Sequence, residues 1–140
     1  MPALVFVDTS AWYAAADADD ASHDRAKRHL GDHAGRLVTS DHVLIETWYL
    51  ATSRLGRDIG EQLVNGIRGG IARVEATQLA DLEAAATIHQ QFPDHRFSIV
   101  DRTSWSVMRR LGLTDAISFD ADFSIYRFGP NRRQALTVHA

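Results

Sequence analysis

The chain contains no cysteine, and only one of its 15 cationic residues, Lys27, is a lysine. The lack of cysteine excludes disulfide bonds, thiolate metal ligands and cysteine nucleophiles, and it fits a reducing cytoplasm. No apolar run approaches the roughly 20 residues of a membrane-spanning helix. The first apolar run breaks at Asp8, too early for a signal peptide. We therefore expect a cytoplasmic protein without membrane contact.

The composition is that of an ordinary globular domain, with 45% hydrophobic and 24% charged residues among 140. A chain of this length buries roughly two thirds of its unfolded surface, so we expect one domain over residues 1–140. The net charge of -3 argues against tight nonspecific DNA binding, for which a basic domain is expected. Arginine suits bidentate phosphate binding, although most single arginines are simply solvated.

Strand-like and helix-like patterns alternate along the chain. Short apolar runs predict strands over 4–7, 36–39, 71–75, 115–119 and 135–139. Helices are expected over 10–16, 22–30, 42–54, 58–68, 77–92 and 98–111, and a short helical turn after Asp120. Gly56 and Gly112 are expected to end two of the helices. The alternation predicts a three-layer α/β/α fold with a mostly parallel sheet of about five strands.

Five acidic residues stand where different elements can deliver them to one place. Asp8 and Asp120 each follow an expected strand, Glu46 and Asp101 lie in expected helices, and Asp122 lies in the turn after Asp120. Ligands bind at the carboxyl ends of strands in open α/β sheets. Crowded carboxylates repel one another unless a cation lies among them, and oxygen ligands without thiolates favour Mg²⁺ or Mn²⁺. The pattern predicts metal-dependent phosphodiester hydrolysis.

Each acid also has a structural explanation when taken alone. Asp8 can cap the helix that follows its strand, and Asp101 completes an S-x-x-D capping box that begins at Ser98. Glu46 can be a solvent-exposed helical residue. The metal-site hypothesis therefore depends on the acids occurring together.

Four segments carry a family resemblance: VFVDTS at 5–10, SDHVLIET at 40–47, FSIVD at 97–101 and SFDADF at 118–123. In this order they resemble the PIN-domain nucleases, and more closely the VapC toxins of bacterial toxin–antitoxin pairs. The resemblance covers nearly the whole chain. It implies a PIN-like fold and a Mg²⁺-dependent endoribonuclease, with Mn²⁺ as a substitute, that cuts structured RNA such as transfer RNA or the sarcin-ricin loop of ribosomal RNA. It also implies a homodimer and a small cognate antitoxin as partner.

The resemblance further implies roles for single residues. The expected metal-binding and catalytic residues are Asp8, Glu46, Asp101 and Asp120, and Asp122 is an alternative last ligand. Thr9, Ser10 and Ser118 are expected beside these ligands as hydrogen-bond partners. Arginines that follow Asp101 are the first candidates for RNA phosphate contact, namely Arg102, Arg109 and Arg110, ahead of Arg96, Arg127, Arg132 and Arg133. The RNA target and the number of metal ions stay open.

Two other functions compete with this interpretation. One is a catalytically inactive PIN-like module that binds RNA or protein, although all the acids are present. The other is a phosphotransfer protein that uses an aspartate at a strand end. Haloacid-dehalogenase-like phosphatases need a D-x-D motif, but Ser10 stands at the second acidic position. Receiver domains need a lysine near the site, but Lys27 lies in an expected surface helix. The seven histidines show no H-E-x-x-H spacing that would indicate zinc.

Overall fold

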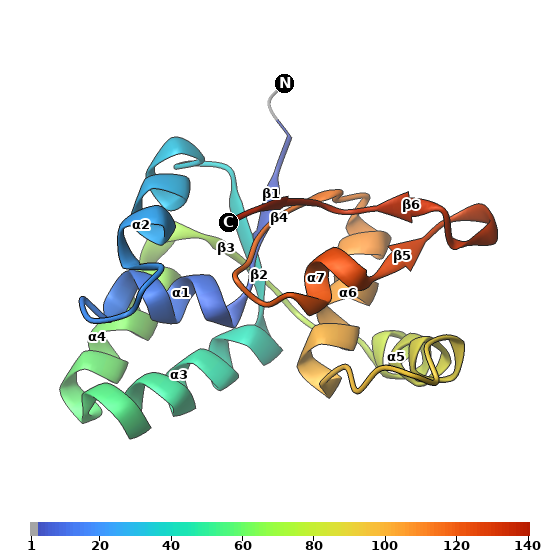
Figure 1. Ribbon diagram of the computed structural model, residues 1–140. Helices are drawn as coiled ribbons and strands as arrows, with labels where there is room; N and C mark the ends of the chain where they lie inside the picture. Colours follow the sequence, from blue (N-terminus) through green and yellow to red (C-terminus); the bar gives the residue numbers. More distant parts are fainter. Residues whose placement is uncertain (1–2) are drawn as a thin grey trace.

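A five-stranded parallel sheet forms the centre of the protein, which a computed structural model describes over residues 3–140 (Figure 1). Its strands are β1 (Val5–Val7), β2 (Leu37–Ser40), β3 (Arg73–Glu75), β4 (Asp115–Ile117) and β7 (Thr137–His139), in the order β3-β2-β1-β4-β7. All neighbouring pairs are parallel, and Val5 of β1 lies opposite Leu37 on one side and Asp115 on the other. The predicted sheet is confirmed.

Helices cover both faces of the sheet (Figure 1). One layer holds α1 (Thr9–Ala16), α2 (His23–Asp32), α3 (Asp41–Leu55) and α4 (Arg57–Gly66). The other holds α5 (Leu79–Gln91), α6 (Ile99–Leu111) and the short α7 (Asp122–Ile125). This is the predicted three-layer architecture. Within residues 3–140, no helix is both long and apolar enough to cross a bilayer.

The core forms on both sides of the central strand β1, whose three residues are all buried. Trp12 of α1 and Trp105 of α6 are fully enclosed, and the ring of Trp105 stacks on Tyr126 with centroids 4.4 Å apart. Burying a large apolar side chain contributes roughly 1.5–3 kcal/mol, so these residues fix the helices that carry them against the sheet.

Helix ends follow the local rules that the sequence indicates. Ser40 caps α3, because its hydroxyl accepts a hydrogen bond from the Val43 N–H at 3.1 Å. Gly56 and Gly112 follow α3 and α6 at φ values of 98° and 71°, which residues with a Cβ rarely adopt. Both predicted stops are confirmed.

Three predicted strands are two residues shorter in the structure, and the one expected over 115–119 ends at Ile117. The strand expected over 71–75 begins at Arg73, because a π-helical segment η1 (Ile67–Ile71) continues α4 through Gly70 at φ 130°. The strand expected over 135–139 begins at Thr137, because Ala135 belongs to an antiparallel hairpin. That hairpin joins β5 (Arg127–Phe128) to β6 (Gln134–Ala135) around a short turn, η2 (Pro130–Arg132).

Candidate metal centre

The strand order places the acidic residues at a topological switch point. From β1 the chain proceeds outward on one side through β2 and β3, and on the other side through β4 and β7. In open parallel sheets, ligands bind outside the carboxyl ends of the strands where the order reverses. Asp8 directly follows β1 and Asp120 follows β4, so both lie at this edge.

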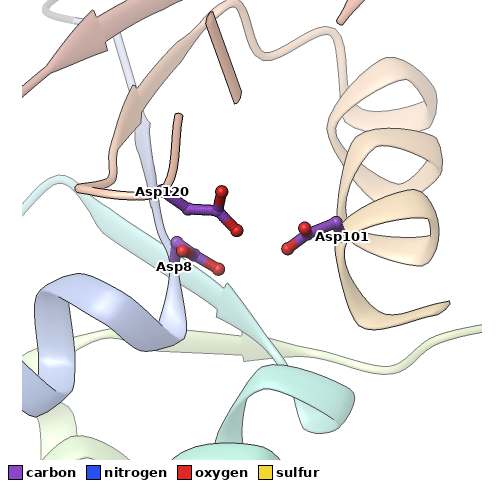
Figure 2. A group of neighbouring side chains, drawn as sticks. All are labelled: Asp8, Asp101 and Asp120. Atoms are coloured by element: carbon purple, nitrogen blue, oxygen red, sulfur yellow. The ribbon is translucent and has the colours of Figure 1, made fainter. Parts of the chain in front are cut away.

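Three aspartates meet there (Figure 2). Asp8 comes from the end of β1, Asp120 from the loop after β4, and Asp101 from the first turn of α6. Carboxylate oxygens of the three residues all lie within 4.8 Å of one another. Asp8 and Asp101 are buried, and Asp120 is half-buried. We call these residues the aspartate trio.

Two serines hold Asp8 in place. Asp8 Oδ2 accepts hydrogen bonds from Ser10 Oγ at 2.8 Å and from Ser118 Oγ at 3.1 Å. It also accepts from the Ser10 N–H at 3.4 Å, so Asp8 caps α1 as well. A carboxylate held by several donors keeps one orientation.

The same serines organise the loop after β4. Ser10 Oγ accepts from the Phe119 N–H at 2.9 Å, and Ser118 Oγ accepts from the Asp120 N–H at 3.1 Å. Asp120 Oδ1 in turn accepts from the Asp122 N–H at 2.9 Å. Ser10 and Ser118 therefore link Asp8 to the loop that carries Asp120, whereas the Thr9 hydroxyl forms no hydrogen bond within residues 3–140.

The electrostatics of the trio favour bound cations. Burial raises the pKa of Asp8 to about 6, against the lowering effect of its bonds from Ser10 and Ser118. Burial also raises the pKa of Asp101, to about 9, and the charges of Asp8 and Asp120 add to this rise. Such shifts mean that ionising all three groups without a counter-charge is unfavourable.

The trio opens into a hollow of about 310 Å³. Its lining residues are Asp8, Thr9, Ser10, Glu46, Leu50, Arg96, Ser98, Asp101, Asp120 and Asp122. Glu46 and Asp122 are half-buried there, but neither joins the set of carboxylates within 4.8 Å. Burial raises the pKa of Asp122, with a further contribution from Asp120. The five acidic residues that the sequence analysis selected therefore line one hollow, and three of them form the aspartate trio.

These residues fit a hard divalent cation. The donors are all oxygen atoms, and three carboxylates converge closely enough to share one ion. Thr9 also lines the hollow, and its buried hydroxyl finds no hydrogen-bond partner within residues 3–140. An unpaired buried hydroxyl beside the trio is consistent with a site that holds water or a ligand.

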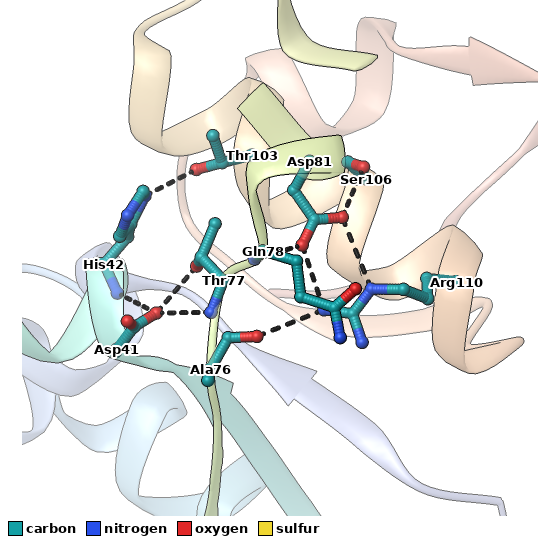
Figure 3. Close-up of polar contacts among 9 residues, drawn as sticks. All are labelled: Asp41, His42, Ala76, Thr77, Gln78, Asp81, Thr103, Ser106 and Arg110. Atoms are coloured by element: carbon teal, nitrogen blue, oxygen red, sulfur yellow. Dashed lines mark hydrogen bonds and ion pairs between the residues drawn. The ribbon is translucent and has the colours of Figure 1, made fainter. Parts of the chain in front are cut away.

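A second polar network fixes α6, the helix that carries Asp101 (Figure 3). Asp81 of α5 accepts a hydrogen bond from the Ser106 hydroxyl at 2.7 Å and forms an ion pair with Arg110 at 2.9 Å. On the other side, His42 of α3 contacts the Thr103 hydroxyl at 3.2 Å. The α6 helix is thus tied to both neighbouring helices.

The three arginines expected first to contact RNA phosphate already have partners within the protein. Arg102 donates to the carbonyl oxygens of Phe97 and Ala85 at 3.2 and 2.8 Å, and Arg110 pairs with Asp81. The guanidinium of Arg109 lies 3.9 Å from the ring centroid of Phe128. Their role in RNA binding stays a prediction.

One lining residue was interpreted in the sequence only as a helix cap. Ser98 does cap α6, accepting from the Asp101 N–H at 3.0 Å, and it also lines the hollow. Residues three apart lie on the same face of a helix, so the spacing of Ser98 and Asp101 could have shown that Ser98 also lies beside the hollow.

Comparisons with known proteins agree with this geometry. The model of the PIN domain family matches residues 5–129. The chain is 40% identical over 126 residues to the "23S rRNA-specific endonuclease VapC20" of Mycobacterium tuberculosis, covering 89% of this chain and 95% of the relative. It is 31% identical over 97 residues to "Ribonuclease VapC26" of the same species, covering 69% and 72%.

Solved structures share the fold. The crystal structure of M. tuberculosis VapC20, described as a sarcin-ricin loop cleaving toxin, superposes with a TM-score of 0.81 at 36% identity, over 86% of this chain and 93% of that one. A DNA-bound VapBC from Salmonella typhimurium superposes at 0.71 with 13% identity, over 98% and 97%. The chain belongs to the PIN-domain family, within its VapC group.

Proposed function

We propose that this chain is the endoribonuclease toxin of a toxin–antitoxin pair and that it hydrolyses RNA with the help of Mg²⁺ or Mn²⁺. The observation that carries the proposal is the convergence of Asp8, Asp101 and Asp120 within 4.8 Å in a hollow open to a substrate. The proposal includes a single functional domain over residues 1–140 and action in the cytoplasm.

The aspartate trio would hold the ion. When bound, a divalent ion activates a water molecule for attack on phosphorus and neutralises charge on the phosphate. Ser10 and Ser118 keep Asp8 oriented, because both hydroxyls donate to the same carboxylate oxygen. Glu46 and Asp122 line the hollow outside the trio, where either can hold a second ion or accept a proton.

For the substrate we propose the sarcin-ricin loop of 23S ribosomal RNA. The support is the 40% identity, over nearly the full length of both chains, to a relative named as a 23S rRNA-specific endonuclease. Transfer RNA is the alternative that the test includes.

The test compares Asp101→Asn with Asp19→Asn, a matched change of an exposed aspartate outside the site. Each protein is incubated with a sarcin-ricin loop hairpin and with transfer RNA, with Mg²⁺, with Mn²⁺ or with EDTA. We expect cleavage by the parent and by Asp19→Asn only with metal, and none by Asp101→Asn, whose circular dichroism stays native. RNA binding without any cleavage by the parent would favour the inactive binding module instead.

We also propose a cognate antitoxin and a homodimer. The VapBC and other toxin–antitoxin complexes among the structural neighbours support an antitoxin partner. A group of exposed apolar side chains supports the dimer: Ile45 and Tyr49 on α3 are 62% and 79% exposed, and Ile99 at the start of α6 is 49% exposed. Light scattering tests it. Tyr49→Glu should give monomers, and a parent that is itself monomeric refutes the dimer.

A further inference from the structure

The hollow contains one cationic side chain among its lining residues, and it belongs to Arg96. Arg96 lies in the loop between α5 and α6, two residues before the cap of α6. It is exposed, and no hydrogen bond or ion pair of its guanidinium is found within residues 3–140. This holds although the hollow contains five carboxylates.

The neighbours of Arg96 fix the direction of the loop. His95 stacks on Phe97, with ring centroids 5.2 Å apart and ring planes 3° apart. Phe97 is buried and packs edge-on against Trp105 with centroids 4.7 Å apart. Phe97 therefore anchors the loop in the aromatic core, and the exposed His95 stacks on it.

Residues in an extended segment alternate in direction. Between Phe92 and α6, residues 95–98 form no helix or turn, and the members that line the hollow are Arg96 and Ser98. Ser98 is held by its bond to the Asp101 N–H. Arg96 is thus attached to a loop that is anchored on one side by aromatic packing and on the other by the helix that carries a trio residue.

The other arginines near α6 lack this freedom. Arg102 donates to backbone carbonyl oxygens, and Arg110 pairs with Asp81. The guanidinium of Arg109 lies over the ring of Phe128. A guanidinium has five N–H donors and no acceptor, so the Arg96 guanidinium has all five donors available for a ligand that enters the hollow.

We propose that Arg96 is a catalytic residue whose guanidinium binds non-bridging oxygens of the scissile phosphate in the acid-lined hollow. The proposal rests on the proposed ribonuclease function and names a further residue for it. RNA must bring its negative phosphate close to the carboxylates, so a positive group on the anchored loop lowers the repulsion. Two parallel N–H donors also match a phosphate and stabilise the charge that grows during attack.

The experiment measures single-turnover cleavage of a sarcin-ricin loop hairpin by the full chain with Mg²⁺. Arg96→Ala should lower the rate about 100-fold, as loss of one transition-state donor does. Arg96→Lys should recover only part of the rate, because an ammonium keeps the charge without the paired donors. The matched control is Arg28→Ala, an exposed arginine on α2, which should cleave at the parental rate.

Two further readouts separate phosphate contact from a structural role. Mn²⁺ affinity should be unchanged or tighter in Arg96→Ala, since a positive charge has left the hollow. In the Asp101→Asn background, where cleavage is absent, Arg96→Ala should weaken hairpin binding and reduce the slope of log affinity against log salt by about 0.7 to 0.9.

The outcomes distinguish this proposal from the proposed function. If the parent cleaves the hairpin, and Arg96→Ala matches Arg28→Ala in rate, binding and salt slope, the role of Arg96 is refuted while the ribonuclease stands. If the parent binds RNA without cleaving it, the proposed function fails, and the binding and salt-slope comparison still decides whether Arg96 contacts phosphate. A joint loss of Mn²⁺ affinity and melting temperature in Arg96→Ala would also overturn the proposal.

Discussion

Replacing Asp101 by asparagine should stabilise the metal-free protein at neutral pH. Asp101 is only 5% exposed, and its pKa is raised from 3.8 to about 9. Without metal the folded protein therefore retains a proton on this group at pH 7, whereas the unfolded chain releases it. Asparagine is neutral in both states, and its amide can donate towards Asp120 as the protonated carboxyl does.

The magnitude follows from proton linkage. Keeping a proton at pH 7 against an unfolded-state pKa of 3.8 costs up to about 4 kcal/mol, at about 1.4 kcal/mol per pH unit. Structural relaxation around asparagine reduces the gain, so we expect about 2 kcal/mol, or roughly 6–10 °C in melting temperature. Because the pKa of Asp101 is higher in the folded than in the unfolded state, the contribution of this group to stability is fully present below pH 3.8. It is lost progressively as the pH rises from 3.8 to 9. The advantage of Asp101→Asn must therefore shrink as the pH is lowered, and it should nearly vanish by pH 4.

Thermal unfolding in EDTA at pH 4 to 8 measures this effect, with Asp19→Asn as the exposed control. Adding Mn²⁺ should reverse the ranking at pH 7, because binding to the folded parent adds about 2.7 kcal/mol at 100 times the dissociation constant. The variant should gain little. The reasoning fails if Asp101→Asn is less stable than the parent in EDTA at pH 7, or if its advantage grows as the pH falls.

Two further changes test the packing that supports the site. Arg110→Ala should destabilise the protein by about 2 kcal/mol in urea unfolding, because the buried Asp81 loses its ion-pair partner. Arg110→Lys should restore part of this stability. An Arg110→Ala variant as stable as the parent would contradict the role of the pair. Gly60→Ala should cost about 1–3 kcal/mol, since its Cβ would lie 2.3 Å from Thr52 Oγ1, whereas Gly31→Ala meets no atom within 4 Å and should raise the melting temperature slightly. Equal melting temperatures for the two alanine variants would refute the close approach of α3 and α4.

Features governed by neighbours in sequence could be predicted from the sequence. The buried strand β1 and the stops at Gly56 and Gly112 each depend on residues within a few positions. The β5–β6 hairpin could not be predicted. Its strands have two residues each, too short for an alternating pattern, so Gly129 and Pro130 mark a turn without showing that strands flank it.

Side-chain partners over long distances in sequence also escaped prediction. Arg110 followed Asp101 on a helix, which suggested a role in RNA binding, but Asp81 lies 29 residues away and only packing of α5 on α6 brings the two together. The placement of Arg96 has the same origin. Its neighbours are held because His95 stacks on Phe97 and Phe97 packs edge-on against Trp105, contacts that periodicity does not show.

The competing interpretations of Asp8, as a helix cap or as a metal ligand, are compatible in the folded protein. Its hydrogen bonds from Ser10 and Ser118 all reach Oδ2, and Oδ1 accepts none within the described part of the chain. One oxygen therefore fixes the start of α1 and the loop after β4, while the other stays available to a cation. Asp101 likewise has two roles: its backbone N–H donates to the capping residue Ser98, and its carboxyl group points towards Asp8 and Asp120. A capping signal at the end of a strand or the start of a helix is thus no evidence against a metal site, because capping supplies the rigidity that a metal ligand needs.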